Sequence, residues 1–125
     1  MKTVKIPEGY PRVMPYLIVE NAAGFLDFTQ KVLGAEVKFK EMRDEKLIMH
    51  AEVSFGDSVI MFADATEQHK PQSAGLFIYV DDCDAVYKKA LENGATVVTE
   101  PGDQSYGRSA GIKDAFGITW WITSL

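Results

Sequence analysis

Two of the residues best suited to chemistry, His50 and Glu52, are two positions apart in the segment 47–55, whose composition is typical of a β-strand. Side chains at this spacing point to the same face of a sheet. An imidazole beside a carboxylate can form part of a transition-metal site, or act as a general base that the carboxylate orients. Two ligands do not complete a metal site, however, and strand residues two apart normally point the same way without close contact. A third possibility is a hydrogen-bonded polar pair that lines a cleft and orients a ligand.

The other reactive side chains indicate no catalytic mechanism. His69 lies in a polar segment and is expected to be solvated. Cys83 stands between Asp82 and Asp84, whose charges disfavour the thiolate form of its side chain. The sequence has no Ser-His-Asp pattern with a supporting motif and no glycine-rich phosphate loop. We therefore assign no catalytic residue, and His50 and Glu52 are the candidates if the protein is an enzyme.

Composition and charge limit the partners that we expect. The 125 residues are 46% hydrophobic and 25% charged, as in an ordinary globular domain with its own core. Thirteen Lys and Arg residues oppose 18 Asp and Glu residues, and no basic cluster is present to neutralise phosphates, so we expect no nucleic acid partner. No run of about 18 apolar residues occurs, so we expect no membrane partner. A single cysteine cannot form an intrachain disulfide, which favours a cytoplasmic location.

The hydrophobic pattern predicts the same order of elements twice: an apolar strand, a helix and three further strands. In the first half these cover 13–19, 22–33, 36–42, 47–55 and 58–63. In the second half they cover 76–80, a helix that begins near Asp82 and closes at Asn93-Gly94, and then 96–100, 108–113 and 118–123. Asn21 is placed to begin the first helix and Gly34 to end it. A polar linker over 64–74 separates the halves.

Matching short segments support an internal repeat. Val19-Glu20-Asn21 matches Val80-Asp81-Asp82 at a shift of 61 positions, and Phe55-Gly56 matches Phe116-Gly117 at the same shift. Gly34-Ala35 matches Gly94-Ala95 at a shift of 60, which implies a shorter second helix. We therefore predict an α+β fold in which two βαβββ repeats form curved, mostly antiparallel sheets around a cleft, with the helices outside. The predicted divisions are an N-terminal arm over 1–12 and one domain over 13–125, with repeat one over 13–63, a linker over 64–74 and repeat two over 75–125.

Strand alternation predicts which side chains face the cleft. They are Met14, Tyr16, Ile18, Ile48, His50, Glu52, Ser54, Ile60, Phe62, Phe77, Tyr79, Thr119, Trp121 and Thr123. This lining is aromatic and apolar with a few polar groups, which suits a flat or amphipathic organic ligand oriented by hydrogen bonds. The alternative is a closed core between the sheets, but it would bury His50 and Glu52 without water or a ligand, at a high cost.

Four segments resemble the vicinal oxygen chelate superfamily of glyoxalases, bleomycin-resistance proteins and extradiol dioxygenases, and most closely its PhnB-like branch. They are VMPYLIV over 13–19, HAEVSFGDSVIM over 50–61, YVDDCDAVY over 79–87 and DAFGITWWIT over 114–123. The resemblance implies the glyoxalase-like fold of paired repeats. In its metal-dependent members, a His on the first strand and a Glu on the last strand of each repeat bind the metal. The corresponding positions here are Met14, Ile60, Gly75 and Trp121, none of which suits Zn, Ni, Fe or Mn.

The same resemblance places the segment Tyr106-Gly107-Arg108-Ser109-Ala110-Gly111 along a cavity entrance. The loop 103–111 is rich in small residues, which suits a segment that moves. Tyr106 and Arg108 are therefore candidates for contact with a carboxylate or phosphate group of a ligand. For Arg108, a surface salt bridge to an acidic residue is an equal alternative.

Three functions are compatible with these observations. The favoured one is a homodimer that binds a small aromatic or amphipathic molecule without a cofactor, through Tyr16, His50, Glu52, Phe77, Tyr79, Tyr106, Arg108 and Trp121. The second is a lyase, isomerase or dioxygenase with a divalent transition metal at a relocated site on His50 and Glu52. The third is an interaction domain with a closed cleft. The homodimer is expected because each sheet has edges to cover, and the arm over 1–12 is suited to cross onto the partner.

Overall fold

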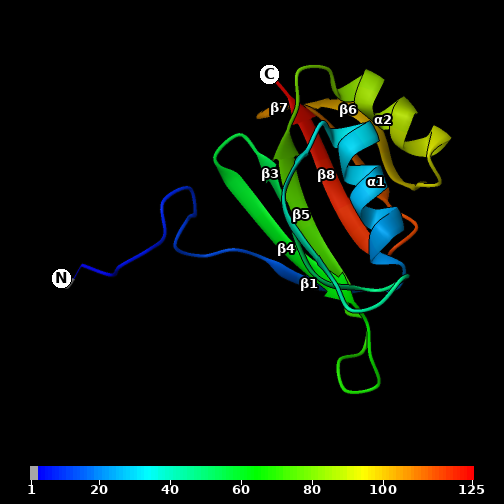
Figure 1. Cartoon of the computed structure of the whole chain (residues 1–125). Coiled ribbons are helices and arrows are strands. Elements are labelled where there is room, and N and C mark those ends of the chain that lie inside the picture. Colours follow the sequence, from blue (N-terminus) through cyan, green and yellow to red (C-terminus); the bar gives the residue numbers. More distant parts are fainter. Residues whose placement is uncertain (1–2) are drawn as a thin grey trace.

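Two four-stranded sheets make up the computed structural model, which describes residues 3–125 (Figure 1). The elements of repeat one are β1 (Tyr16–Val19), α1 (Ala22–Leu33), β2 (Glu36–Met42), β3 (Ile48–Phe55) and β4 (Ser58–Asp64). Those of repeat two are β5 (Ala74–Tyr79), α2 (Cys83–Glu92), β6 (Thr96–Gln104), β7 (Gly107–Lys113) and β8 (Ile118–Ser124). The strand order is β1-β4-β3-β2 in the first sheet and β5-β8-β7-β6 in the second. The predicted α+β fold of two βαβββ repeats is confirmed.

The two sheets have the same pairing but not the same spacing along the chain. In each, the first strand runs parallel to the last and the other neighbours are antiparallel. Tyr16 pairs with Met61, whereas Phe77, 61 positions after Tyr16, pairs with Trp121, 60 positions after Met61. The predicted match of Phe55-Gly56 to Phe116-Gly117 at a shift of 61 is therefore wrong as a match of strand positions. The turn between β3 and β4 has two residues, while that between β7 and β8 is longer, so similar turn residues stand at different strand positions.

Helix α1 has the two ends that the sequence predicts. Asn21 adopts a left-handed conformation (φ 61°), and its side-chain oxygen accepts a hydrogen bond from the N–H of Gly24 at 3.0 Å. Gly34 ends the helix at φ 72°, a conformation that glycine adopts without steric cost. Asp82, whose backbone is extended, caps α2 with its side-chain oxygen, which accepts a hydrogen bond from the N–H of Ala85. These caps fix where each helix starts over its sheet.

Each sheet has one face covered by a helix, the helix side, and one face without a helix, which we call the open face. Helix α1 packs on β2, β3 and β4, and α2 packs on β6, β7 and β8. Phe25 of α1 contacts Phe62 of its own sheet and also Phe116 and Trp120 of repeat two, with ring centroids 4.9, 5.8 and 6.5 Å away. The helix sides of both repeats therefore share one aromatic core.

A buried carboxylate connects three elements of repeat one. Asp64, predicted to begin an exposed linker, is instead the last residue of β4 and is only 4% exposed. Its Oδ1 accepts a hydrogen bond from the N–H of Ala22 at 2.8 Å, and its Oδ2 accepts one from the N–H of Ile48 at 2.7 Å. The start of α1 and the start of β3 are thus held to the end of β4.

The bounds of a predicted loop also differ. The predicted loop over 103–111 is largely strand, because β6 continues through Pro101 to Gln104 and β7 begins at Gly107, which leaves only a two-residue turn. Proline is tolerated there because β6 is an edge strand.

The arm over 3–12 has no helix or strand and extends from the body of the protein (Figure 1). The first two residues of the predicted arm lie outside the described residues. Within residues 3–125, no helix has the length and apolar character needed to cross a membrane.

The Asp64→Ala variant should lose about 2–4 kcal/mol of unfolding free energy, because two buried backbone N–H groups lose their acceptor. Urea unfolding followed by tryptophan fluorescence measures the change. The matched control is Asp57→Ala, which removes an exposed carboxylate from the turn between β3 and β4 and should change stability by less than about 0.5 kcal/mol. Equal effects of the two substitutions would contradict the role of Asp64.

Candidate functional site

The open face of the first sheet carries the predicted polar pair. The register places Tyr16 of β1 next to Met61 of β4, and Met61 next to Glu52 of β3. Glu52 in turn lies opposite Phe39 of β2. One row of side chains therefore crosses all four strands on this face.

Three hydrogen bonds join the polar members of this face into a chain. Tyr10 donates its hydroxyl to Glu52 Oε1, and His50 Nε2 lies 2.8 Å from Glu52 Oε2. The Tyr16 hydroxyl lies 3.2 Å from His50 Nδ1, on the other side of the imidazole ring. The prediction that His50 and Glu52 would not come into close contact is therefore wrong. We call Tyr10, Glu52, His50 and Tyr16 the polar chain.

Burial and hydrogen bonding set the charge of this chain. Glu52 is only 6% exposed. Its burial raises the pKa, but hydrogen bonds from Tyr10 and His50, helped by nearby Lys38, outweigh it and leave the pKa below its ordinary value. Because an ionised carboxylate only accepts, His50 Nε2 carries a proton and donates it to Glu52. In the neutral imidazole, Nδ1 is then free to accept from Tyr16.

Tyr10 is the site residue that sequence analysis missed. It lies in the arm, 42 positions from Glu52, and no periodic pattern connects the two. The Lys38 ammonium lies over the Tyr10 ring, 4.5 Å from its centre, and makes a cation–π contact with it. The hydrogen bond to Glu52 raises the pKa of Tyr10. The arm is thus attached to the open face through the polar chain.

Two β-bulges in the pairing of β2 with β3 determine which side chains lie beside the polar chain on the open face. A register shift at Lys38 brings Phe39 to the open face, where its ring centroid lies 5.9 Å from that of His50. A second shift at Met49 places Ile48 on the helix side, where it is fully buried, rather than beside His50 as predicted. Phe39 therefore covers one flank of the imidazole.

The open face of the second sheet is aromatic. The register places Phe77 next to Trp121, and Tyr79 next to Thr123, on strands β5 and β8. Phe77 also contacts Tyr79 and Tyr106, with ring centroids 5.2 and 6.4 Å away. Half or more of Phe77, Tyr79 and Tyr106 is exposed. We call Phe77, Tyr79, Tyr106 and Trp121 the aromatic group.

Trp121 lies flat against the backbone of the neighbouring strand. A Cβ on Gly111 would come within 2.5 Å of its ring, so glycine is required for this close approach. The indole Nε1 lies toward Gly75, where an added Cβ would be 3.9 Å away. Gly75 and Trp121 thus occupy two of the four positions that correspond to metal ligands in the metal-dependent proteins. The indole of Trp121 fills the space beside Gly75.

The four inherited positions do not fit a metal ion. Ile60 lies on the helix side opposite buried Val53, so its selection was wrong by one residue. The residue on the open face that corresponds to Trp121 is Met61. Phe62, also predicted to face the cleft, packs against α1. With Met14 just before β1, Met61 on β4, Gly75 on β5 and Trp121 on β8, the set has no carboxylate or imidazole. Among residues 3–125, no three His, Cys, Asp or Glu side chains gather as a metal site.

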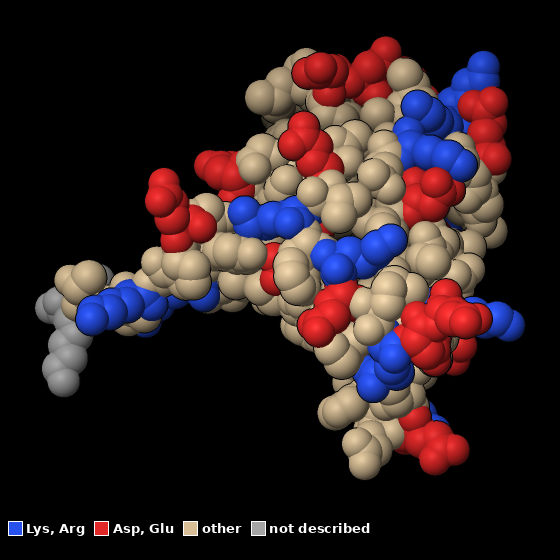
Figure 2. All heavy atoms as spheres, viewed as in Figure 1, with Lys and Arg blue, Asp and Glu red and all other residues tan. Residues whose placement is uncertain are grey.

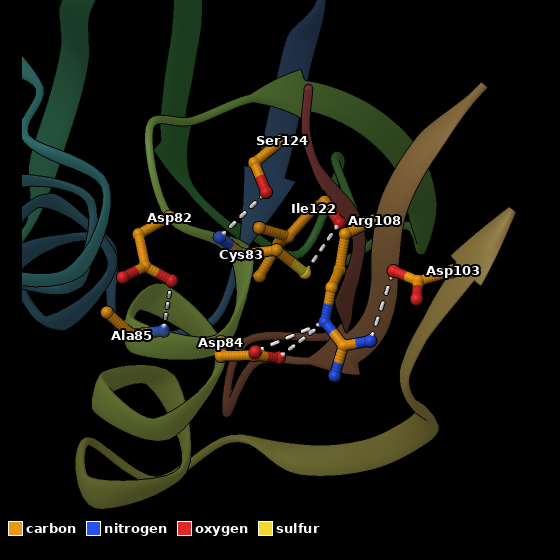
Figure 3. Close-up of polar contacts among 8 residues, drawn as sticks. All are labelled: Asp82, Cys83, Asp84, Ala85, Asp103, Arg108, Ile122 and Ser124. Atoms are coloured by element: carbon orange, nitrogen blue, oxygen red, sulfur yellow. Dashed lines mark hydrogen bonds and ion pairs between the residues drawn. The ribbon is translucent and has the colours of Figure 1, made fainter.

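Arg108 is not part of the open face. It pairs with Ser124, on the helix side of the second sheet, whereas its neighbour Ser109 pairs with Thr123. Its Nε donates to both carboxylate oxygens of Asp84 at 3.1 and 3.2 Å, and its Nη1 donates to Asp103 at 3.2 Å (Figure 3). The alternative of a surface salt bridge is therefore confirmed for Arg108, while its contact with a ligand stays a prediction.

A pocket of about 850 Å³ lies where the two repeats meet. It is formed by the segment before β1, the turn between β3 and β4, and strand β5. Its apolar lining includes Val13, Pro15, Phe55, Ile60, Leu76, Phe77, Tyr79 and Trp120. Because Phe77 and Tyr79 also belong to the aromatic group, the pocket adjoins the open face of the second sheet.

Substituting Gly111 with Ala should displace Trp121 and destabilise the protein by about 1–3 kcal/mol, because the new methyl group overlaps the indole ring. Urea unfolding measures the loss, and quenching of tryptophan fluorescence by acrylamide measures the greater exposure of Trp121. Gly102→Ala, on the adjacent strand β6, is the control, since its nearest contact would be at 3.7 Å. If both variants behave alike, the packing of Trp121 does not depend on Gly111.

Known proteins resemble this chain over nearly its whole length. Mb0911c, an uncharacterised protein of Mycobacterium bovis, is 31% identical over 122 residues, which cover 88% of this chain and 80% of the relative. The bleomycin-binding protein of Streptomyces verticillus, solved with copper(II)-bleomycin, has a TM-score of 0.61 at 23% identity and covers 98% of this chain and 99% of its own. TnmS3, an antibiotic-binding protein of a Streptomyces species, has a TM-score of 0.70 at 20% identity (89% and 92% covered). The PhnB protein of Bacillus cereus has a TM-score of 0.70 at 16% identity (92% and 100% covered).

A family model gives the assignment directly. The model of the Glyoxalase/Bleomycin resistance protein/Dioxygenase superfamily matches residues 9–122. That range covers repeat one and repeat two as far as Ile122 in β8, and it includes the polar chain and the aromatic group. The chain belongs to the glyoxalase, bleomycin resistance protein and dioxygenase superfamily.

Proposed function

We propose that this protein binds a small aromatic or amphipathic molecule on its open faces. The observation that carries the proposal is the set of exposed aromatic rings, Phe77, Tyr79 and Tyr106, on a sheet face without a covering helix. Exposed rings gathered in this way are typical of a binding surface, because each offers a large apolar area in a fixed position. The polar chain and the adjoining pocket add hydrogen-bonding groups and an apolar recess.

Two structural relatives support this kind of ligand. One is a bleomycin-binding protein and another is described as an antibiotic-binding protein. Both share the fold with this chain at low sequence identity, so they support the class of function rather than a particular ligand.

The proposed activity needs no cofactor and fits a cytoplasmic protein. Both ring nitrogens of His50 already have partners in the polar chain, and Glu52 is held by two donors. Cys83 is buried, and burial, together with the charge of Asp84, raises its pKa, so the thiol is protected from reaction. Acidic and basic side chains are interspersed on the face shown in Figure 2, which offers no basic surface for phosphates.

A panel of planar aromatic compounds should contain ligands that raise the melting temperature, since a ligand at a hundred times its dissociation constant adds ~2.7 kcal/mol of stability. Phe77→Ala should weaken the binding of each hit at least about tenfold, or ~1.4 kcal/mol. The matched control is Val97→Ala, which removes a half-exposed apolar side chain from the helix side of the same sheet. A panel without hits would favour an interaction domain with a closed cleft, and equal loss in both variants would move the binding site elsewhere.

We also propose that the protein is a homodimer in which the arm contacts the partner. Val4 and Ile6 are 47% and 40% exposed on an arm that extends from the body, and both sheets have open edges (Figure 1). Apolar side chains on such a segment are stabilised by burial against a second chain.

Light scattering at micromolar concentration should therefore give about 28 kDa, twice the chain mass of 13.9 kDa. Ile6→Asp should shift the protein toward monomer, because it places a charge in the proposed contact. Lys5→Glu, on the same arm, is the control that changes charge without removing an apolar side chain. A monomer for the unmodified chain would contradict the proposal.

A further inference from the structure

The polar chain has one buried end and one accessible end. Glu52 is almost fully buried and His50 is partly buried, whereas half of Tyr16 is exposed on the open face. The ring of Tyr16 is stacked on that of His50 with centroids 5.5 Å apart, so the tyrosine is held in place while its hydroxyl remains within reach of a ligand. The order carboxylate, imidazole and hydroxyl is that in which a buried charge activates an exposed hydroxyl group.

We propose that Glu52, His50 and Tyr16 form a metal-free proton relay that accepts the proton of an acidic hydroxyl group, phenolic or enolic, on the bound ligand. This inference rests on the proposed binding function and specifies the chemistry of the ligand. Tyr16 is the residue that touches the ligand. His50 and Glu52 are positioning residues that act through it.

The proton transfers balance without any further reactant. The ligand hydroxyl gives its proton to the Tyr16 oxygen as the Tyr16 proton moves to His50 Nδ1. The products are a ligand oxyanion, an intact Tyr16 hydroxyl that donates to it, and an imidazolium ion paired with the Glu52 carboxylate. No bond other than O–H and N–H bonds is made or broken. The net charge of the site is unchanged, because the new anion and the new cation form together.

The surroundings favour this transfer over simple protonation from solvent. Phe39 lies beside the imidazole and reduces its contact with water. The charged and titratable groups near the relay are Glu41, which pairs with His50 across from β2, Lys38 from the same strand, and Tyr10 from the arm. Met61 and Ala63, the neighbours on β4, do not titrate. The carboxylate of Glu41 helps to stabilise an imidazolium at His50, as Glu52 does.

A pair of probes of similar shape tests the relay: 4-nitrophenol, whose absorption changes when it ionises, and 4-nitroanisole, in which a methoxy group replaces the hydroxyl and no acidic proton is present. Their absorption and binding are measured with the full-length protein over a pH range that spans the ionisation of free 4-nitrophenol. Bound 4-nitrophenol should have an apparent pKa at least about one unit below that of the free phenol, a tenfold change in its ionisation equilibrium.

Three variants separate the relay from mere contact. Tyr16→Phe, His50→Gln and Glu52→Gln should each abolish the pKa shift of bound 4-nitrophenol, measured with each variant saturated by the probe so that a loss of affinity does not affect the result. Tyr87→Phe on α2 is the matched control, because it removes a phenolic hydroxyl far from the relay and should retain the full shift. Urea unfolding checks that each variant is folded.

The outcomes distinguish the relay from the binding function. If the unmodified protein binds both probes without a pKa shift, the relay is wrong and binding stands. If 4-nitroanisole binds and 4-nitrophenol does not, the relay is also wrong. If the shift persists in Tyr16→Phe, another group accepts the proton. If neither probe binds, the relay and the binding of simple aromatic molecules both fail.

Discussion

The packing of Phe25 against aromatic side chains of both repeats is the contact on which the rest of the architecture depends. A sheet in water must bury one of its faces, and here the helix sides of both sheets do so in one shared core. Because this core already contains Phe62 and Trp120, the alternate residues of the same strands are directed to the open faces. The polar chain and the aromatic group are therefore positioned by a core to which they do not belong.

The three buried carboxylates Asp64, Asp114 and Glu52 differ in the kind of group that donates hydrogen bonds to them. Asp64 and Asp114 accept hydrogen bonds from backbone N–H groups and, for Asp114, from the Trp120 indole, so they hold chain segments together. Burial outweighs these bonds at Asp114 and raises its pKa. Glu52 is held by side chains alone, one of which comes from the arm. Since side chains move more readily than backbone, Glu52 is the carboxylate of the three that can respond to a ligand.

The sequence predicted features that depend on local chemistry and missed those that depend on distant contacts. Asn21 and Gly34 marked the ends of α1 because capping needs only neighbouring residues. Alternation placed Phe77 and Trp121 correctly on their face, but it failed for Ile60, since β4 is apolar on both sides and a turn of different length changes the repeat spacing. The bulge at Met49 and the contact of Tyr10 with Glu52 leave no periodic signal at all. The candidate site was thus predicted in its residue types and only partly in its geometry.

Because Tyr10 donates a hydrogen bond to Glu52, the attachment of the arm depends on the charge of the Glu52 carboxylate. A carboxylate attracts a hydroxyl donor more strongly than a neutral carboxylic acid does. Any event that removes the negative charge of Glu52, or that draws its oxygens toward another donor, therefore weakens the attachment of the arm. The state of the open face and the freedom of the N-terminal segment are linked through a single carboxylate, although no rigid element connects them.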